Sequence, residues 1–179
     1  LPVGCINHSL HFFPDGKITK GSLKQAELAA RTEIQAIAAE FSSSHWQKAY
    51  GSSGTARALA HILTLNGYNN GNNEEIITLA GLEKLREFLL KTGDIKKLEI
   101  TGLNPARKAI IAGGFAIMSA VFTELNIDYM AIATGALREG VLYDMLGRFH
   151  KEDTREISVQ EFMQRYRVDP VQAARIESL

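Results

Sequence analysis

The sequence has a single cysteine, no net charge and no segment that resembles a signal peptide. Cys5 has no partner for an internal disulfide, which fits a protein of the reducing cytoplasm. Lysine plus arginine and aspartate plus glutamate number 20 each, so no overall positive field attracts DNA or an anionic membrane. No apolar run approaches the roughly 20 residues that a membrane span needs. A site for an anion must therefore be built from local groups.

The sequence also lacks the residue patterns of a metal site and of a hydrolase triad. The five histidines form no cluster with the cysteine or with spaced carboxylates, so no metal site is expected. His8 and His11 lie three apart in a strand-like segment, which would place them on opposite faces. Ser52 and Ser53 have no evident histidine and aspartate partners, so a hydrolase triad is not supported.

The length sets the number of domains. A chain of 179 residues with 45% hydrophobic residues can form one sizeable core and part of a second domain. It opens with Leu1 rather than methionine and closes on an apolar-periodic stretch without a helix stop signal. We therefore expect a piece of a longer protein.

What the sequence does contain is glycine at informative places. In three segments a short apolar run meets small residues and then an amphipathic helix: 46–50 before Gly51-Ser52-Ser53-Gly54-Thr55, 109–112 before Gly113-Gly114, and 129–133 before Thr134-Gly135-Ala136. A glycine turn that leads into a helix points free N–H groups at the helix start, where the helix dipole favours an anion such as phosphate. Three such turns predict a phosphate-handling α/β lobe.

The hydrophobic pattern predicts strands and helices in alternation. Loose alternation over 3–13, followed by Pro14-Asp15-Gly16-Lys17, predicts a β-hairpin. A helical period begins at Ser22, the expected N-cap, and continues to residue 41. Further helices are expected from the 51–55 turn to Gly67, over 79–89 with Gly93 as the stop, over 115–125 and over 136–146. Further strands are expected at 46–50, 109–112 and 129–133. This order predicts an α/β lobe with a mixed sheet and flanking helices over residues 1–147.

Residues 148–179 have a different character. The stretch 148–156 is densely charged and is typical of a linker or an exposed helix end. Ser158 and Glu161 form a capping-box pattern, and Asp169-Pro170 combines an N-cap with proline at the first helical position. We expect a short helical tail that begins a truncated helical domain.

Gly51-Ser52-Ser53-Gly54-Thr55 is the main candidate for phosphate binding. Its glycines allow the backbone to approach a phosphate closely, and its hydroxyl groups add donors. The spacing is neither that of a Walker A loop, which needs a lysine, nor that of a dinucleotide-binding fingerprint, which needs a third glycine. The alternative is a tight strand-to-helix turn with a serine cap.

Four weaker candidates for phosphate binding are Gly113, Gly114, Arg107 and Arg138. The paired glycines would serve close packing in the alternative interpretation. Arg138 lies in the first turn of a helix, where a positive charge opposes the dipole, and this suggests that it faces an anion. An ion pair with Glu139 is the alternative. Arg107 precedes an expected buried strand and fits either purpose.

The ordered motifs carry a family resemblance. The segment from Gly51 to Ala58 resembles the second phosphate loop of the exopolyphosphatase/guanosine pentaphosphate phosphatase (Ppx/GppA) family. The block from Gly113-Gly114-Phe115 through Arg138-Glu139-Gly140 to Tyr143 is similar to the same family, and 165–169 resembles the entry to its helical third domain. The resemblance covers nearly the whole chain.

The resemblance implies a ribonuclease H-like lobe of the actin and sugar-kinase superfamily, the second of two lobes that face each other across a cleft. It implies a cytoplasmic, magnesium-dependent phosphohydrolase that releases the terminal phosphate of polyphosphate or guanosine pentaphosphate, with a glutamate as base. The first-lobe motifs, among them an Asp-x-Gly-Gly-Gly-Ser motif and the catalytic glutamate, do not occur in this sequence. We therefore expect neither the base nor the magnesium ligands in this chain, and we expect it to be inactive alone.

Two other functions stay open at the level of sequence. A non-enzymatic sensor of guanosine tetraphosphate would use the same loop. A lobe of a sugar- or acetate-kinase-like ATPase should show an adenosine-binding motif around Gly113-Gly114, and the Arg138-Glu139-Gly140 block favours the phosphatase instead. The sequence predicts no DNA or membrane partner and leaves a homodimer open.

Overall fold

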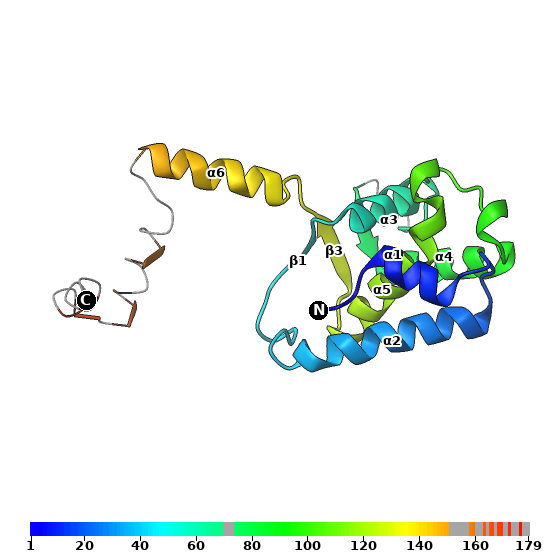
Figure 1. The fold of residues 1–179 in the computed structure, drawn as a ribbon, viewed down its shortest axis with the longest axis horizontal. Helices are drawn as coiled ribbons and strands as arrows, with labels where there is room; N and C mark the ends of the chain where they lie inside the picture. Colours follow the sequence, from blue (N-terminus) through cyan, green and yellow to red (C-terminus); the bar gives the residue numbers. More distant parts are fainter. Residues whose placement is uncertain are drawn as a thin grey trace. The chain divides into compact units, whose positions relative to one another are not determined.

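The computed structural model describes residues 1–69 and 74–150, without the side chains of 146–150, and a few short stretches between 158 and 176. Figure 1 shows the elements in chain order. Contacts divide the chain into two units, Leu1–Thr134 and Gly135–Leu179. The expected lobe boundary after Gly147 falls within a helix of the second unit. The expected capping box at Ser158 and the helix after Asp169 lie largely outside the described residues.

The chain begins with a helix, so the predicted β-hairpin is wrong. α1 spans Cys5–Phe12 and buries His8 and Ser9. The predicted turn follows it: the Gly16 N–H donates to the Phe13 carbonyl at 3.0 Å, and Gly16 has the left-handed φ of +75° that favours glycine. The hairpin prediction failed because loose alternation over 3–13 also places residues 8, 9 and 12 on one side of a short helix.

α2 spans Lys20–Ala38 and begins with a capping box. The Thr19 side chain accepts a hydrogen bond from the Ser22 N–H at 3.0 Å, and the Ser22 hydroxyl accepts one from the Thr19 N–H at 3.0 Å. Thr19 is therefore the N-cap and Ser22 the third helical residue, which corrects the predicted cap. The predicted period is confirmed by the buried residues Leu23, Ala26, Ala30 and Ile34, but the helix ends at Ala38 rather than at residue 41, and Phe41 is exposed.

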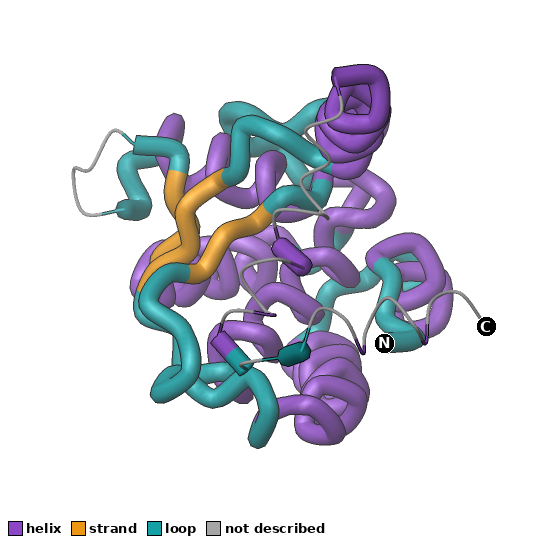
Figure 2. Tube along the Cα trace, turned by 90° about the vertical axis from the view of Figure 1, so that its left-hand side faces the viewer, coloured by secondary structure: helices purple, strands orange, loops and turns teal. Residues whose placement is uncertain are grey.

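Three short strands form one mixed sheet in the order β1-β3-β2. β1 (Ala49–Gly51) pairs parallel with β3 (Tyr129–Ile132), and β2 (Ile76–Thr78) pairs antiparallel with β3. β1 and β3 therefore end at one edge of the sheet, and β2 begins at that same edge. A mixed sheet was predicted, but β2 was not, since three residues give too short a pattern. Figure 2 shows the three strands side by side with helices packed against them.

The helices that follow β1 and β2 agree with the sequence pattern. α3 spans Gly54–Leu65 and α4 spans Leu79–Thr92. Ser53 caps α3 by accepting a hydrogen bond from the Ala56 N–H at 3.0 Å. α4 ends at Gly93, whose φ of +66° is the left-handed conformation expected of a glycine stop.

The predicted strand at 109–112 is wrong. This run closes the 3₁₀ helix η2 (Pro105–Ile110) and opens α5 (Ile111–Glu124), while a shorter 3₁₀ helix, η1, spans Ile95–Lys97. A short apolar run fits a buried strand and a buried helix equally, and α5 packs against α1, α2, α3 and α4.

The apolar character of α5 also corrects the expectation that no apolar run approaches the length of a membrane span. Together, η2 and α5 form a 20-residue helical segment, Pro105–Glu124, that is long and apolar enough to cross a membrane by length and composition alone. Within the fold, 56% of the most apolar part of this segment is buried. Because α5 packs against four other helices, its apolar composition is that of a core helix.

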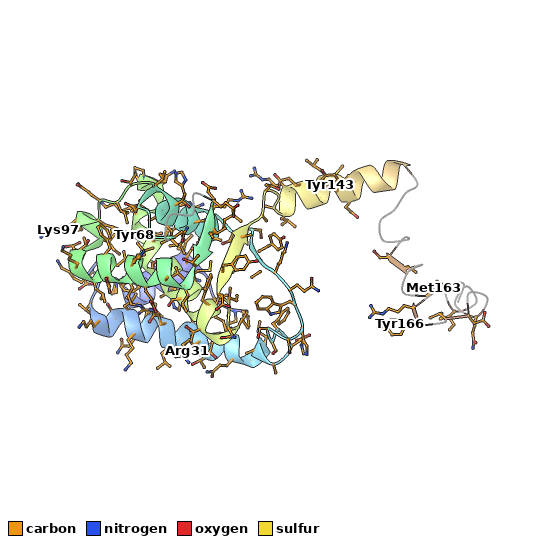
Figure 3. All side chains as sticks on the ribbon, turned by 180° about the vertical axis from the view of Figure 1, so that it is seen from behind. Arg31, Tyr68, Lys97, Tyr143, Met163 and Tyr166 are labelled. Carbon is orange, nitrogen blue, oxygen red and sulfur yellow. The ribbon has the colours of Figure 1, made fainter. Side chains whose placement is uncertain are left out.

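The core of the first unit lies between the sheet and these helices. Its large, fully buried side chains include Leu23, Leu59, Leu63, Ile77, Leu85, Phe115 and Phe122. The second unit begins with α6 (Leu137–His150), which was predicted and which continues beyond its expected end at Gly147. The Ala136 N–H donates to the Glu139 carboxylate at 2.8 Å and so closes the start of α6. Tyr143, labelled in Figure 3, is 73% exposed on this helix.

Candidate functional site

The loop between β1 and α3 holds the main candidate, Gly51-Ser52-Ser53-Gly54-Thr55. It lies at the edge where the parallel strands β1 and β3 end, and ligands of α/β sheets bind at such edges. The first N–H groups of α3 have no acceptor within the helix apart from the Ser53 cap, and the dipole favours an anion beside them. The loop therefore has the position and polarity that the sequence predicted.

Gly51 has a packing role in this loop. It is buried where β1 meets α3 and β3. A Cβ atom at this position would lie 2.7 Å from the Ala56 Cβ and 2.8 Å from the Met130 Sδ, both closer than side chains approach. Glycine is therefore required for the turn to sit tightly on the sheet.

Arg107 of η2 packs against Gly54, the first residue of α3. A Cβ atom on Gly54 would lie 2.9 Å from the Arg107 Cζ and 3.0 Å from its Nη1, so the guanidinium fills the space that glycine leaves. Arg107 is half-buried, and among the described residues its side chain forms no ion pair. A half-buried cation beside a helix N-terminus is unfavourable unless an anion joins the two. The structure thus brings two predicted phosphate-binding residues together.

Gly54 and Arg107 line an open cleft of about 760 Å³, a size typical of ligand sites. Its walls come from α3, the loop before η2, the end of β3 and the residue before β2. The other lining residues are Arg57, Ala58, His61, Glu75, Gly102, Asn104, Ile132, Ala133 and Thr134. Two arginines, Arg57 and Arg107, are among the residues that line this cleft.

Two interactions hold side chains of the cleft in place. The Arg57 Nη2 donates to the Ala133 carbonyl, with a long distance of 3.5 Å. The His61 Nδ1 lies 2.9 Å from a Glu75 carboxylate oxygen. These contacts connect α3 to the end of β3 and to the start of β2.

The hydroxyl residues of the loop line a different hollow. Ser52, Ser53 and Thr55 border a space of about 480 Å³ whose other walls are largely apolar, including Ile117 and Met118 of α5. The candidate residues are therefore divided between two hollows. The structure brings Gly54 and Arg107 together in the charged cleft and leaves the hydroxyl groups on the apolar side.

Gly113 and Gly114 lie inside α5 and are buried, so the predicted strand-to-helix turn is wrong here. The Gly113 N–H donates to the Ser9 hydroxyl at 3.2 Å, and a Cβ atom on Gly113 would lie 2.7 Å from the Ser9 nitrogen. A Cβ atom on Gly114 would lie 2.6 Å from the Thr55 Cγ2. These contacts support the packing alternative, since both glycines allow α5 to approach its neighbours closely.

Arg138 lies in the first turn of α6, as predicted, and is exposed. It belongs to the second unit, Gly135–Leu179. Its role in phosphate binding stays a prediction. Glu139, its alternative ion-pair partner, accepts the hydrogen bond from the Ala136 N–H.

The histidine placement differs from the prediction, because His8 and His11 lie three apart on a helix rather than on opposite faces of a strand. The His8 Nε2 lies 2.7 Å from the Ala26 carbonyl, which ties α1 to α2. Within the described ranges, no group of three or more histidine, cysteine, aspartate or glutamate side chains is placed to hold a metal ion. The described residues therefore do not form a magnesium site by themselves.

Sequence reasoning missed Arg57, His61, Glu75 and Asn104 as cleft residues. Residues 54, 57, 58 and 61 have the spacing of one helix face. Arg57 and His61 could therefore be predicted once Gly54 is placed at the start of the helix. Glu75 and Asn104 come from separate loops and carry no local pattern. The pairing of β2 with β3 brings Glu75 to the cleft, whereas Asn104 lies there as the N-cap of η2.

The comparisons with known proteins agree with this geometry. The sequence pattern of the Ppx/GppA phosphatase family matches residues 1–149. The chain belongs to the Ppx/GppA phosphatase family. A curated relative, the guanosine-5'-triphosphate,3'-diphosphate pyrophosphatase of Pseudoalteromonas translucida (strain TAC 125), is 37% identical over 179 residues. The chain spans 35% of the length of that relative.

Solved structures of Ppx/GppA proteins show the same fold. The type II variant of the Aquifex aeolicus Ppx/GppA phosphatase matches with a TM-score of 0.60 and 20% identity, over 79% of this chain and 47% of that one. A second Aquifex aeolicus structure of the family matches with a TM-score of 0.59 and 21% identity, over 83% of this chain and 48% of that one. The predicted fold class, an actin-like, ribonuclease H-like α/β lobe with a mixed sheet, is confirmed.

Proposed function

We propose that this chain supplies a phosphate-binding lobe, the second lobe, of a Ppx/GppA-type phosphohydrolase. The observation that carries the proposal is the half-buried Arg107 guanidinium against Gly54, at the start of α3 and in a cleft that Arg57 also lines. The two guanidinium groups and the N-terminus of α3 bring positive charge to the same cleft. A phosphate there would receive charge-assisted hydrogen bonds from several sides.

The favoured substrate is guanosine pentaphosphate, because the curated relative at 37% identity carries that activity in its name. Polyphosphate, which the family resemblance also implies, is the alternative substrate. Since the chain spans 35% of that relative, the activity is proposed for the whole protein that contains this lobe. We also propose a cytoplasmic location, which the single cysteine supports.

The proposed reaction is attack of water on the terminal phosphorus, in line with the departing phosphate oxygen. Negative charge then spreads over the oxygens of the transferred group. Arg107 and Arg57 would hold those oxygens or their neighbours and stabilise this charge, and neither arginine would exchange a proton. The resemblance implies that the general base and the magnesium ligands come from the facing lobe.

Replacing Arg107 tests this proposal. In the protein that contains this lobe, Arg107→Ala should lower kcat/KM for phosphate release from guanosine pentaphosphate by roughly 10²–10³, the usual effect of removing one charge-stabilising donor. Lys108→Ala removes the neighbouring positive charge of η2 and is the matched control. An Arg107→Ala enzyme with unchanged kcat/KM would show that the cleft does not hold the phosphates.

The same assay separates the enzyme from a sensor of guanosine tetraphosphate. A sensor would bind the nucleotide through the same arginine but release no phosphate from any of these substrates. Loss of binding in Arg107→Ala, together with an inactive unsubstituted protein, would favour the sensor.

A further inference from the structure

We propose that the His61–Glu75 pair recognises a guanine base and so selects a guanosine nucleotide over inorganic polyphosphate. This inference rests on the proposed function, because it assigns the end of the cleft that the phosphate-binding residues do not occupy. The observation behind it is that one cleft is lined by two arginines and also by a carboxylate. Arg57 and Arg107 line it together with Gly54, whereas a carboxylate, Glu75, lines it beside His61.

The spacing of these groups along α3 suits a nucleotide. Gly54, Arg57, Ala58 and His61 line the cleft from one face of the helix. His61 follows Gly54 by seven residues, which corresponds to about 10 Å along the helix axis. A ligand with its phosphates at Gly54 would therefore extend its nucleoside along α3 toward His61.

The strand order explains why a carboxylate reaches this place. Because β2 runs antiparallel to β3, its first residue lies at the edge where β3 ends, and Ile76 pairs with Ala131. Glu75 immediately precedes Ile76 and is thereby held at that edge. The Thr64 hydroxyl donates to the Glu74 carbonyl at 3.0 Å, which fastens this segment to α3.

Hydrogen-bond chemistry decides which base fits. Guanine presents two adjacent donors, the N1–H and the 2-amino group, and an ionised carboxylate only accepts. Adenine presents an acceptor at its own N1 position, which would face the carboxylate oxygen. A polyphosphate chain offers acceptors and negative charge alone, so Glu75 would repel it. The carboxylate therefore matches guanine and disfavours both competitors.

His61 is a positioning residue for this carboxylate. Its Nδ1 lies 2.9 Å from the Glu75 oxygen, and one Glu75 carboxylate can accept several hydrogen bonds, so capacity remains for a base. Gly102 has a φ of +85°, and a Cβ atom there would lie 3.1 Å from the His61 Cδ2. The imidazole is therefore held between Gly102 and Glu75.

The test measures binding to the protein that contains this lobe, with GTP, ATP and tripolyphosphate as probes and without turnover. The unsubstituted protein should bind GTP at least tenfold more tightly than ATP. Glu75→Gln replaces one acceptor with an amide donor and should remove this preference, while binding of tripolyphosphate stays equal or becomes tighter. Glu74→Gln makes the same change one residue earlier and should keep the preference. His61→Gln should reduce the preference without changing tripolyphosphate binding.

The outcomes separate this inference from the proposed function. Equal affinity for GTP and ATP in the unsubstituted protein would overturn the inference, as would an equal loss of GTP and tripolyphosphate binding in Glu75→Gln. If Arg107→Ala still weakens all three probes in that case, the phosphate site stands. If Arg107→Ala changes none of them, the proposed function fails. Circular dichroism of each variant checks that it is folded.

Discussion

Gly54 differs from Gly51 and Gly113 in what occupies the space beside it. The spaces beside Gly51 and Gly113 are filled by core side chains or by backbone, which cannot move. The space beside Gly54 is filled by the end of the Arg107 side chain, which can shift at little cost. The absence of a side chain at Gly54 therefore matters more for the position of Arg107 in the cleft than for the packing of the core.

Gly54→Ala should weaken phosphate binding and leave the fold intact. The added methyl group would push the Arg107 guanidinium away from the helix start, while alanine in a helix is more favourable than glycine by about 1 kcal/mol. We expect weaker tripolyphosphate binding with an equal or higher free energy of unfolding in denaturant. Gly140→Ala on α6, where no atom lies within 4 Å of the added Cβ, is the control and should leave binding unchanged. Full binding by Gly54→Ala would mean that the position of Arg107 is unimportant.

At the scale of elements, one ion pair connects the turn after α1 with η1. The Lys17 Nζ lies 2.7 Å from an Asp94 carboxylate oxygen, and the other oxygen accepts from the Lys96 N–H at 2.8 Å. The hydrogen bond from Lys17 lowers the pKa of Asp94, with help from the Lys96 N–H. The same contact raises the pKa of Lys17. The pair joins segments far apart in sequence, so its charge state bears on how the unit holds together.

The pair makes stability depend on pH in a defined direction. Because the folded pKa of Asp94 is lowered, its contribution is complete above the ordinary aspartate pKa of about 3.9 and is lost as the pH falls through the lowered value. The raised pKa of Lys17 means that its contribution is lost as the pH rises through that higher value. Asp94→Asn should therefore destabilise the protein at neutral pH and lose this effect in acid, as measured by urea unfolding. Asp128→Asn is the control. The same deficit at all pH values would show that charge does not matter here.

The elements also show what the sequence can and cannot predict. α3, α4 and β3 were predicted because their segments contain local sequence signals, such as the Ser53 N-cap and the glycine stop at Gly93. α1 and the start of α5 were mistaken for strands because a short apolar run has no period of its own. The cleft could be predicted only in part: Gly54 and Arg107 were candidates, but Glu75 reaches the site through the pairing of β2 with β3.

For the whole molecule, we expect this chain alone to fold and to bind phosphate weakly without releasing it from substrate. Phosphoryl transfer needs a positioned nucleophile as well as charge stabilisation, and loss of the base alone costs roughly 10²–10⁴ in rate. The measurement is phosphate release from polyphosphate and guanosine pentaphosphate with magnesium, by this chain and by one extended to the length of the relatives. Equal turnover by the two would mean that this lobe contains the catalytic group.

The position of β3 in the chain has a consequence for biosynthesis. β3 is the central strand of the described sheet, with β1 and β2 on either side, yet it is the last strand of its unit in sequence. A ribosome releases α1 through α5 before β3 appears, so the earlier strands wait unpaired during translation. Pairing over such sequence separations is slow. The backbone edges of β1 and β2 therefore stay unpaired until Ile132 has left the exit tunnel, and this interval is when a chaperone would be needed most.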